Sequence, residues 1–172
     1  MTLDLSEGLE GIRRNLGNPD YDGSRFLVTG GAGFLRTWLC SFLVKQGADV
    51  LCLDNLSSGL RENVSHLEEN PRFSFILHDI SEPIHFRQNI DYVFHLASRA
   101  SPLEFDKFPL EIIRANTLGT MHALDSATEH GARLLFTSTS EVYGNAGIFP
   151  TPETYHGNVH TLGIRGCYDE SK

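Results

Sequence analysis

A tyrosine and a lysine near the end of the sequence could carry acid–base chemistry. Tyr168 and Lys172 are four residues apart, so on a helix they would share a face. A lysine ammonium beside a tyrosine stabilises the phenolate, which suits the tyrosine for removing hydroxyl protons near neutral pH. Earlier in the chain, hydroxyl and carboxyl side chains follow an apolar run, at Thr139, Ser140 and Glu141. We expect a hydroxyl from this strand end to hold the substrate oxygen whose proton the tyrosine removes.

A glycine-rich turn near the start of the chain is typical of a phosphate-binding loop. Residues 29–35 read TGGAGFL and follow a strand-like run. Gly30 and Gly33 would let backbone N–H groups point at a pyrophosphate at the start of a helix. Asp54 closes the second apolar run, where a carboxylate accepts from ribose hydroxyls and repels a 2′-phosphate. These features predict a dinucleotide site that takes NAD rather than NADP. A Tyr-x-x-x-Lys spacing is common by chance. The same spacing after a glycine loop and a hydroxyl-rich strand end, in that order, is poorly explained by chance.

The elements that must position these residues alternate along the chain. Apolar runs predict strands over 25–29, 50–53, 73–77, 91–97 and 134–138, and helical spacing predicts helices over 34–46 and 110–130. Such alternation favours a parallel sheet with helices on both faces and ligands beyond the carboxyl ends of its strands. We predict an α/β fold, a three-layer Rossmann-type doubly wound sheet, over residues 25–172, with residues 1–24 as an N-terminal extension.

Composition narrows the class of protein. The 172 residues, 40% of them hydrophobic, suffice for one core. A formal net charge of −8 argues against nucleic acid or an anionic membrane as a partner. Three cysteines without close spacing, no signal core and no membrane-length apolar stretch favour a cytoplasmic protein with reduced thiols. We expect no metal site, because the histidines lack nearby further ligands.

Several segments together resemble the extended short-chain dehydrogenase/reductases of the NAD-dependent epimerase/dehydratase family, which act on nucleotide sugars. Within that family the chain is most similar to the decarboxylase branch, whose substrate is UDP-glucuronate. The matching segments are FLVTGGAGFL, LDNLSSG, HDI at 78–80, VFHLASRASP, RANTLGT at 114–120, ARLLFTSTSEVYG and GCYDESK. They extend over nearly all of residues 26–172.

The resemblance implies a role for each matching position. Thr139 would bind the sugar hydroxyl at C4, Tyr168 would take its proton, and Glu141 would assist a later reprotonation. C4 would be oxidised, CO₂ would leave the resulting β-keto acid, and re-reduction would yield UDP-xylose with NAD unchanged. NAD would lie against Gly30, Gly33, Phe34, Leu35, Asp54, Asn55, Asp79, Ile80, Leu96, Ala97 and Lys172. The substrate would contact Ser98, Arg99 and Ser140.

Two side chains bear on how far the resemblance extends. Arg36 stands where the dinucleotide fingerprint has a third small residue, so either the local packing differs or cofactor binding is impaired. Ser140 stands where the dehydratases have aspartate, and serine is a poor acid for expelling a hydroxyl. This favours decarboxylation, with a 4-epimerase or a 4,6-dehydratase as alternatives.

The length of the chain also departs from the family. Its members continue beyond the position of Lys172 with the rest of the Tyr-Lys helix, further strands, and a C-terminal lobe that binds the nucleotide sugar. The Tyr-Lys helix commonly forms the interface of a homodimer. We therefore expect an incomplete NAD-binding domain that ends at the Tyr-Lys helix and is poorly active alone. A non-catalytic dinucleotide-binding module is the alternative.

Overall fold

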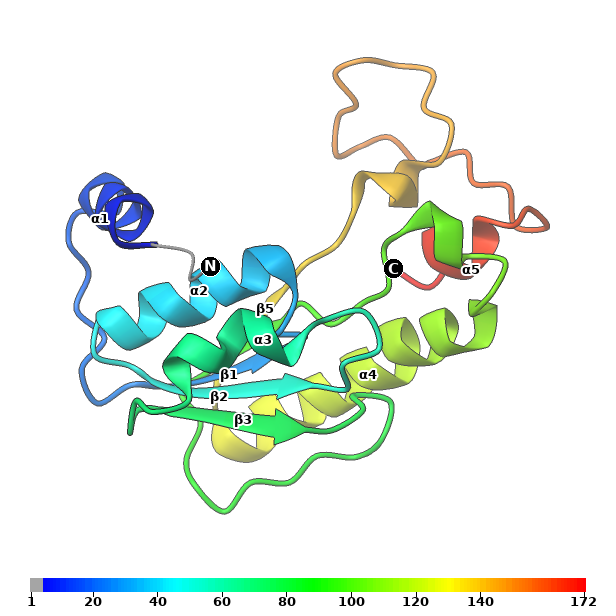
Figure 1. Ribbon diagram of the computed structural model, residues 1–172. Helices are drawn as coiled ribbons and strands as arrows, with labels where there is room; N and C mark the ends of the chain where they lie inside the picture. The colour runs from blue at the N-terminus through cyan, green and yellow to red at the C-terminus, as the bar shows by residue number, and fades with distance from the viewer. Residues whose placement is uncertain (1–4) are drawn as a thin grey trace.

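The computed structural model describes residues 5–172, and a five-stranded parallel sheet forms its centre (Figure 1). The strands are β1 (Arg25–Thr29), β2 (Asp49–Asp54), β3 (Phe73–Leu77), β4 (Tyr92–His95) and β5 (Arg133–Phe136). Their spatial order is β3-β2-β1-β4-β5, so the chain moves outward from β1 to β3 and then crosses to the other side of β1. The predicted α/β architecture is confirmed, and the crossover creates a switch point between β1 and β4, where such sheets bind ligands.

Helices cover both faces of this sheet, as Figure 1 shows. On one face α2 (Phe34–Lys45) and the short α3 (Arg61–Val64) pack over Phe26 and Val28. On the other face α4 (Pro109–His130) packs over Leu27. Successive strand residues point to opposite faces, so each strand of a sheet covered on both sides must be apolar throughout. This explains the continuous apolar runs in the sequence.

The long helix α4 turns the face marked by its large apolar residues toward solvent. Leu110, Met121 and Leu124 are 62%, 58% and 47% exposed. The buried face carries mostly small or polar residues: Ile112, Asn116, Gly119, Ala123, Ser126 and Ala127. A Cβ at Gly119 would lie 2.8 Å from Ile80 Cγ2, so only small side chains allow this close approach. Gly131 ends the helix with φ +63°, which a glycine adopts without strain.

Two predicted strands are shorter in the structure than in the sequence pattern. The strand predicted over 91–97 ends at His95, because the N–H groups of Leu96 and Ala97 both donate to the Thr29 hydroxyl, at 3.1 Å. The strand predicted over 134–138 ends at Phe136, and the next carbonyl, of Thr137, accepts from the Lys172 ammonium. In both places a side chain replaces the sheet as the hydrogen-bond partner.

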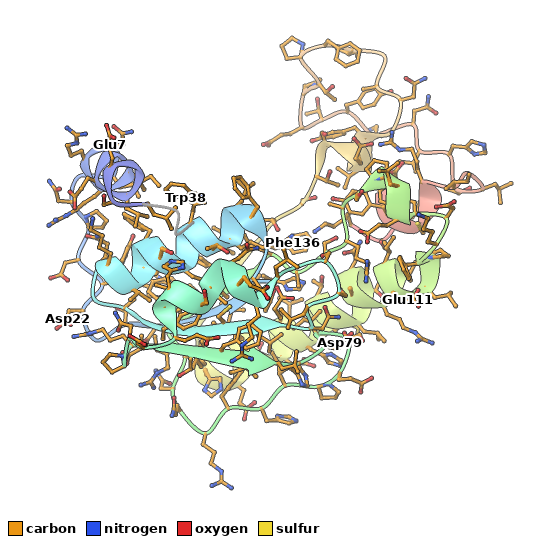
Figure 2. All side chains as sticks on the ribbon, viewed as in Figure 1. Glu7, Asp22, Trp38, Asp79, Glu111 and Phe136 are labelled. Carbon is orange, nitrogen blue, oxygen red and sulfur yellow. The ribbon has the colours of Figure 1, made fainter. Side chains whose placement is uncertain are left out.

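The remaining elements are short or lie at the edge of the fold. They are η1 (Ser65–Leu67), η2 (Pro102–Glu104), η3 (Ser140–Tyr143), α5 (Gly166–Asp169) and α1 (Ser6–Asn15). Leu9 of α1 is buried beside Phe42 of α2, and a Cβ at Gly8 would lie 2.6 Å from the Trp38 ring, which is labelled in Figure 2. The division at residue 24 stays a prediction, and residues 1–4 lie outside the described residues. Within residues 5–172 no helix has the length and apolar character that crossing a membrane requires.

Candidate active site

A cleft of about 230 Å³ opens at the carboxyl edge of the sheet. Segments that follow β1, β2, β3 and β4 line it together with the start of α4, and Figure 2 shows Asp79 and Glu111 on this side. Eight residues predicted from the sequence lie in its wall: Gly30, Asp54, Asn55, Asp79, Ile80, Ala97, Ser98 and Arg99. Parallel strands bring these residues together although they are far apart along the chain.

The glycine turn needs its first glycine for two reasons. Gly30 has φ +71°, and a Cβ on it would lie 2.8 Å from the Cα of Ala97 in the loop after β4. The turn leads into α2, whose first turn holds no acidic residue and whose N-cap, Gly33, offers no side chain. Phe34 and Leu35 begin the helix with exposed side chains, and neither they nor Leu96 lines the cleft.

Asp54 holds the cleft together as well as lining it. Its carboxylate accepts from the N–H of Ala32 in the glycine turn, at 3.0 Å, and from the N–H of Leu56 after β2, at 2.8 Å. The residue is only 6% exposed. Sequence reasoning assigned Asp54 a ligand role alone, whereas the structure shows that it also connects two loops of the cleft.

Behind the cleft, His95 belongs to a buried network that the sequence analysis missed. Thr29 Oγ1 accepts from two backbone N–H groups, so its own proton must go to His95 Nδ1, 2.9 Å away. His95 therefore carries its proton on Nε2 and donates to the Thr120 hydroxyl, at 3.2 Å. Burial, with smaller effects from Lys172 and Arg36, lowers the pKa of His95 to about 4. The apolar pattern around His95 predicts only a buried strand.

The neutral His95 predicts a loss of stability in acid. An unfolded histidine has a pKa of about 6.5, so between pH 6.5 and 4 the unfolded chain binds the extra proton and stability falls as the pH falls. A pKa lowered this far corresponds to roughly 3 kcal/mol. Urea unfolding at pH 7 and pH 4 should show this loss, and His95→Gln should reduce it. The matched variant His85→Gln, at an exposed histidine, should keep the full loss; an unchanged pH dependence in His95→Gln would contradict the assignment.

Asn116 is a second residue of the site that received no role from the sequence. It is 3% exposed, accepts from the Ser98 hydroxyl at 2.8 Å and donates to the Ser171 hydroxyl at 2.9 Å. It thus joins α4 to the loop after β4 and to the segment that carries Tyr168 and Lys172. The proton of the Ser98 hydroxyl is therefore already used in this bond. In the sequence, Asn116 is marked only by its place in the matching segment RANTLGT, which by itself indicates no role.

Tyr168 and Lys172 are held one helical turn apart at the edge of the sheet. The Lys172 N–H donates to the Tyr168 carbonyl at 3.2 Å, which continues the helical bonding past α5. The Lys172 ammonium donates to the Thr137 carbonyl at 2.7 Å and lies 4.9 Å from the Phe136 ring centre. Burial and the charge of Arg36 lower the pKa of Lys172 to about 8. Tyr168 is buried and stacks on Phe105, with ring centres 5.1 Å apart.

Of the residues predicted to handle the sugar, Ser98 and Arg99 line the cleft, whereas Thr139, Ser140, Glu141 and Tyr168 do not. Thr139 caps η3 and accepts from the Glu141 N–H at 3.3 Å, and Ser140 is exposed. Glu141 forms an ion pair with Arg165. Arg99 does line the cleft, but it pairs with Glu104 and donates to the Ser57 carbonyl. The structure therefore assembles the predicted cofactor residues more completely than the predicted substrate residues.

Part of the cleft wall offers groups of the kind that bind a ribose and a base. Asp54 offers carboxylate oxygens, Asn55 donates to Asp79 at 2.7 Å, and the buried Ile80 supplies an apolar surface. The position of Gly30 against Ala97 lets backbone approach a bound nucleotide closely. The Arg36 side chain also lines the cleft and lies against the glycine turn.

Comparison with known proteins agrees with this geometry. The family model described as "NAD dependent epimerase/dehydratase family" matches residues 26–172. The chain is 47% identical over 148 residues to UDP-glucuronic acid decarboxylase 1 of Arabidopsis thaliana, which covers 86% of this chain and 34% of that protein. It is 42% identical over 151 residues to UDP-glucuronic acid decarboxylase 1 of Xenopus tropicalis, covering 88% and 35%.

A solved structure gives the same picture of the fold. The UDP-glucose 4-epimerase of Thermotoga maritima, determined with UDP-glucose, superimposes with a TM-score of 0.71 and 31% identity, over 86% of this chain and 47% of that one. The chain thus spans about a third of the length of the two decarboxylases and about half of the epimerase.

Proposed function

Because this chain belongs to the NAD dependent epimerase/dehydratase family, we propose that it supplies the NAD-binding core of an enzyme that decarboxylates UDP-glucuronate. The family that the sequence motifs indicated is confirmed. The observation that carries the proposal is that Tyr168 lies one helical turn from Lys172, whose ammonium donates to the strand end at Thr137. The names of the two decarboxylases described above support the choice of substrate.

Each residue has a proposed task in this reaction. Asp54 and Asn55 would hold the adenosine ribose of NAD, which when bound supplies the hydride acceptor and donor for C4 of the sugar. Tyr168 would remove the proton of the C4 hydroxyl, and Thr139 would hold that hydroxyl. Lys172, with a pKa of about 8, is mostly protonated at pH 7 and would stabilise the Tyr168 phenolate. A ketone at C4 is β to the C5 carboxylate, so loss of CO₂ leaves an enolate that Glu141 would help to reprotonate.

Glu141 must leave its ion pair for that task. In the structure it is bound to Arg165, which also contacts Asp169 at 3.6 Å. Asp169 could keep Arg165 paired once Glu141 turns away. In the structure, the ion pair with Arg165 therefore holds the Glu141 carboxylate outside the cleft.

Release of CO₂ tests the proposed reaction. The protein made from the complete reading frame is incubated with NAD and carboxyl-labelled UDP-glucuronate, and we expect labelled CO₂ together with UDP-xylose. NAD should not be consumed, since the reaction begins and ends at the same oxidation state. Turnover of UDP-glucose to its 4-epimer or to a 4-keto-6-deoxy sugar, without CO₂ from UDP-glucuronate, would overturn the proposal.

We also propose that the complete protein forms a homodimer. The exposed apolar side chains of α4 support this, since Leu110, Met121 and Leu124 leave a hydrophobic helix face open.

A further inference from the structure

The Arg36 side chain places a positive charge in the cleft, beside the glycine turn. Its Nη1 lies 2.7 Å from the position that a Cβ on Gly33 would take and 3.3 Å from that on Gly30. Its Nη2 lies 3.5 Å from the Ser98 carbonyl, across the switch point. The side chain therefore bends back from α2 over the glycine turn instead of pointing into solvent. It fills space that glycines at positions 30 and 33 would otherwise leave open.

The guanidinium has no carboxylate partner within residues 5–172. The long contact to Ser98 is its one described hydrogen bond, although a guanidinium offers five N–H donors. Arg99, in the same cleft, has Glu104, the Ser57 carbonyl and the Phe108 ring, 4.4 Å from its guanidinium carbon. Burial lowers the pKa of Arg36, against the opposing effects of Asp54 and Tyr168. Because this half-buried cation has few hydrogen-bond partners, an anion that accepts from its free N–H groups would stabilise it.

The surroundings of Arg36 suit a phosphate group. The helix α2 begins beside it, and its first N–H groups have no acidic or capping side chain within the first turn. Arg114 adds a second, exposed guanidinium to the wall of the cleft. The carboxylates of Asp54 and Asp79 in the wall of the cleft already have partners: Asp54 accepts from the N–H groups of Ala32 and Leu56, and Asp79 accepts from Asn55. Glu111 also lies in the wall, one helical turn before Arg114. The glycine turn and Arg36 are the part of the cleft that suits a phosphate.

The size of the cleft sets a limit on the ligand. Its volume of about 230 Å³ lies below the roughly 300–1,000 Å³ of typical small-molecule pockets. A dinucleotide has to continue past a diphosphate at the glycine turn to a second nucleoside, and the Arg36 side chain lies over that turn. A mononucleotide ends at its phosphates, where the guanidinium can bind a terminal phosphate dianion through two parallel hydrogen bonds.

We propose that Arg36 makes this cleft select an adenosine mononucleotide with a terminal phosphate, such as ADP, over the dinucleotide NAD. The inference rests on the proposed function only in treating the cleft as an adenine-nucleotide site. In a complete enzyme, ADP would then compete with NAD, and Arg36 would determine the strength of that competition.

Calorimetric titration of the 172-residue chain with ADP and with NAD tests the proposal. We expect the unchanged chain to bind ADP at least about tenfold more tightly than NAD, a difference of about 1.4 kcal/mol. Arg36→Met keeps most of the volume but removes the charge, so ADP affinity should fall about tenfold while NAD affinity stays low. Arg36→Ala removes charge and volume, so ADP affinity should fall and NAD affinity should rise about tenfold. Alanine and methionine are both good helix formers, which protects the fold of α2.

Arg14→Met, on the exposed face of α1, is the matched control and should change neither affinity. Tight NAD binding that is the same in the unchanged chain and in Arg36→Ala would overturn the inference and leave the proposed function standing. ADP binding that survives Arg36→Met would also overturn it. Absence of binding by either nucleotide to both the unchanged chain and Arg36→Ala would instead remove the adenine-nucleotide site itself, and with it the proposed function.

Discussion

Replacing Tyr168 by phenylalanine is expected to lower kcat for CO₂ release from UDP-glucuronate by roughly 10²- to 10⁴-fold, the usual contribution of a positioned general base. The substitution removes one oxygen atom and keeps the ring that stacks on Phe105 at 5.1 Å. The fold and the cleft should therefore stay intact while the proton acceptor is lost. The measurement is labelled CO₂ release by the protein from the complete reading frame at saturating NAD and substrate.

A second tyrosine provides the control for this substitution. Tyr21 packs edge-on against Phe26, with ring centres 5.4 Å apart, on the side of the sheet away from α4. Tyr21→Phe removes the same atom and should leave kcat unchanged. If Tyr168→Phe kept more than a tenth of the activity, or if its NAD affinity fell in parallel with kcat, the assignment of Tyr168 as the base would be wrong.

Asp54→Ala should cause the largest loss of stability among the cleft residues. The carboxylate is buried and accepts two backbone N–H bonds, from Ala32 and from Leu56. Hydrogen bonds to a charged group contribute about 1.5–3 kcal/mol each, so their joint loss predicts roughly 3–5 kcal/mol. For a domain of this size that corresponds to a fall in Tm of about 6–15 °C. Urea and thermal unfolding of the 172-residue chain measure both quantities.

Asp54→Asn separates the charge of this side chain from its shape. The amide keeps one oxygen acceptor, so we expect about half of the stability loss together with weaker nucleotide binding. Asp49→Ala is the comparison, because Asp49 starts the same strand but forms only a partly exposed ion pair with Arg25, at 3.3 Å. A loss in Asp54→Ala no larger than in Asp49→Ala would show that the carboxylate does not hold the two loops together.

The sheet and the position of the cleft follow from local patterns in the sequence. Apolar runs predicted all five strands. The central strands β1 and β2 are buried on both faces and leave little room for polar alternation, whereas the edge strands β3 and β5 are only partly buried. The turn at Gly30 and the acidic end of β2 at Asp54 predicted two walls of the cleft. These inferences succeed because they need only neighbours along the chain, together with the rule that the carboxyl ends of parallel strands share one edge.

Contacts between distant segments account for what the sequence alone left open. The periodic pattern located α4, but which of its faces is buried depends on the close approach of Gly119 to Ile80. The spacing placed Glu141 among hydroxyl residues, whereas Arg165, from another segment, pairs with its carboxylate. Arg36 was recognised as a departure, but its direction, back over the glycine turn toward Ser98, is set by the loop after β4. A long side chain has several rotamers and its partners lie far along the chain, so its final direction is determined only when the sheet brings those partners together.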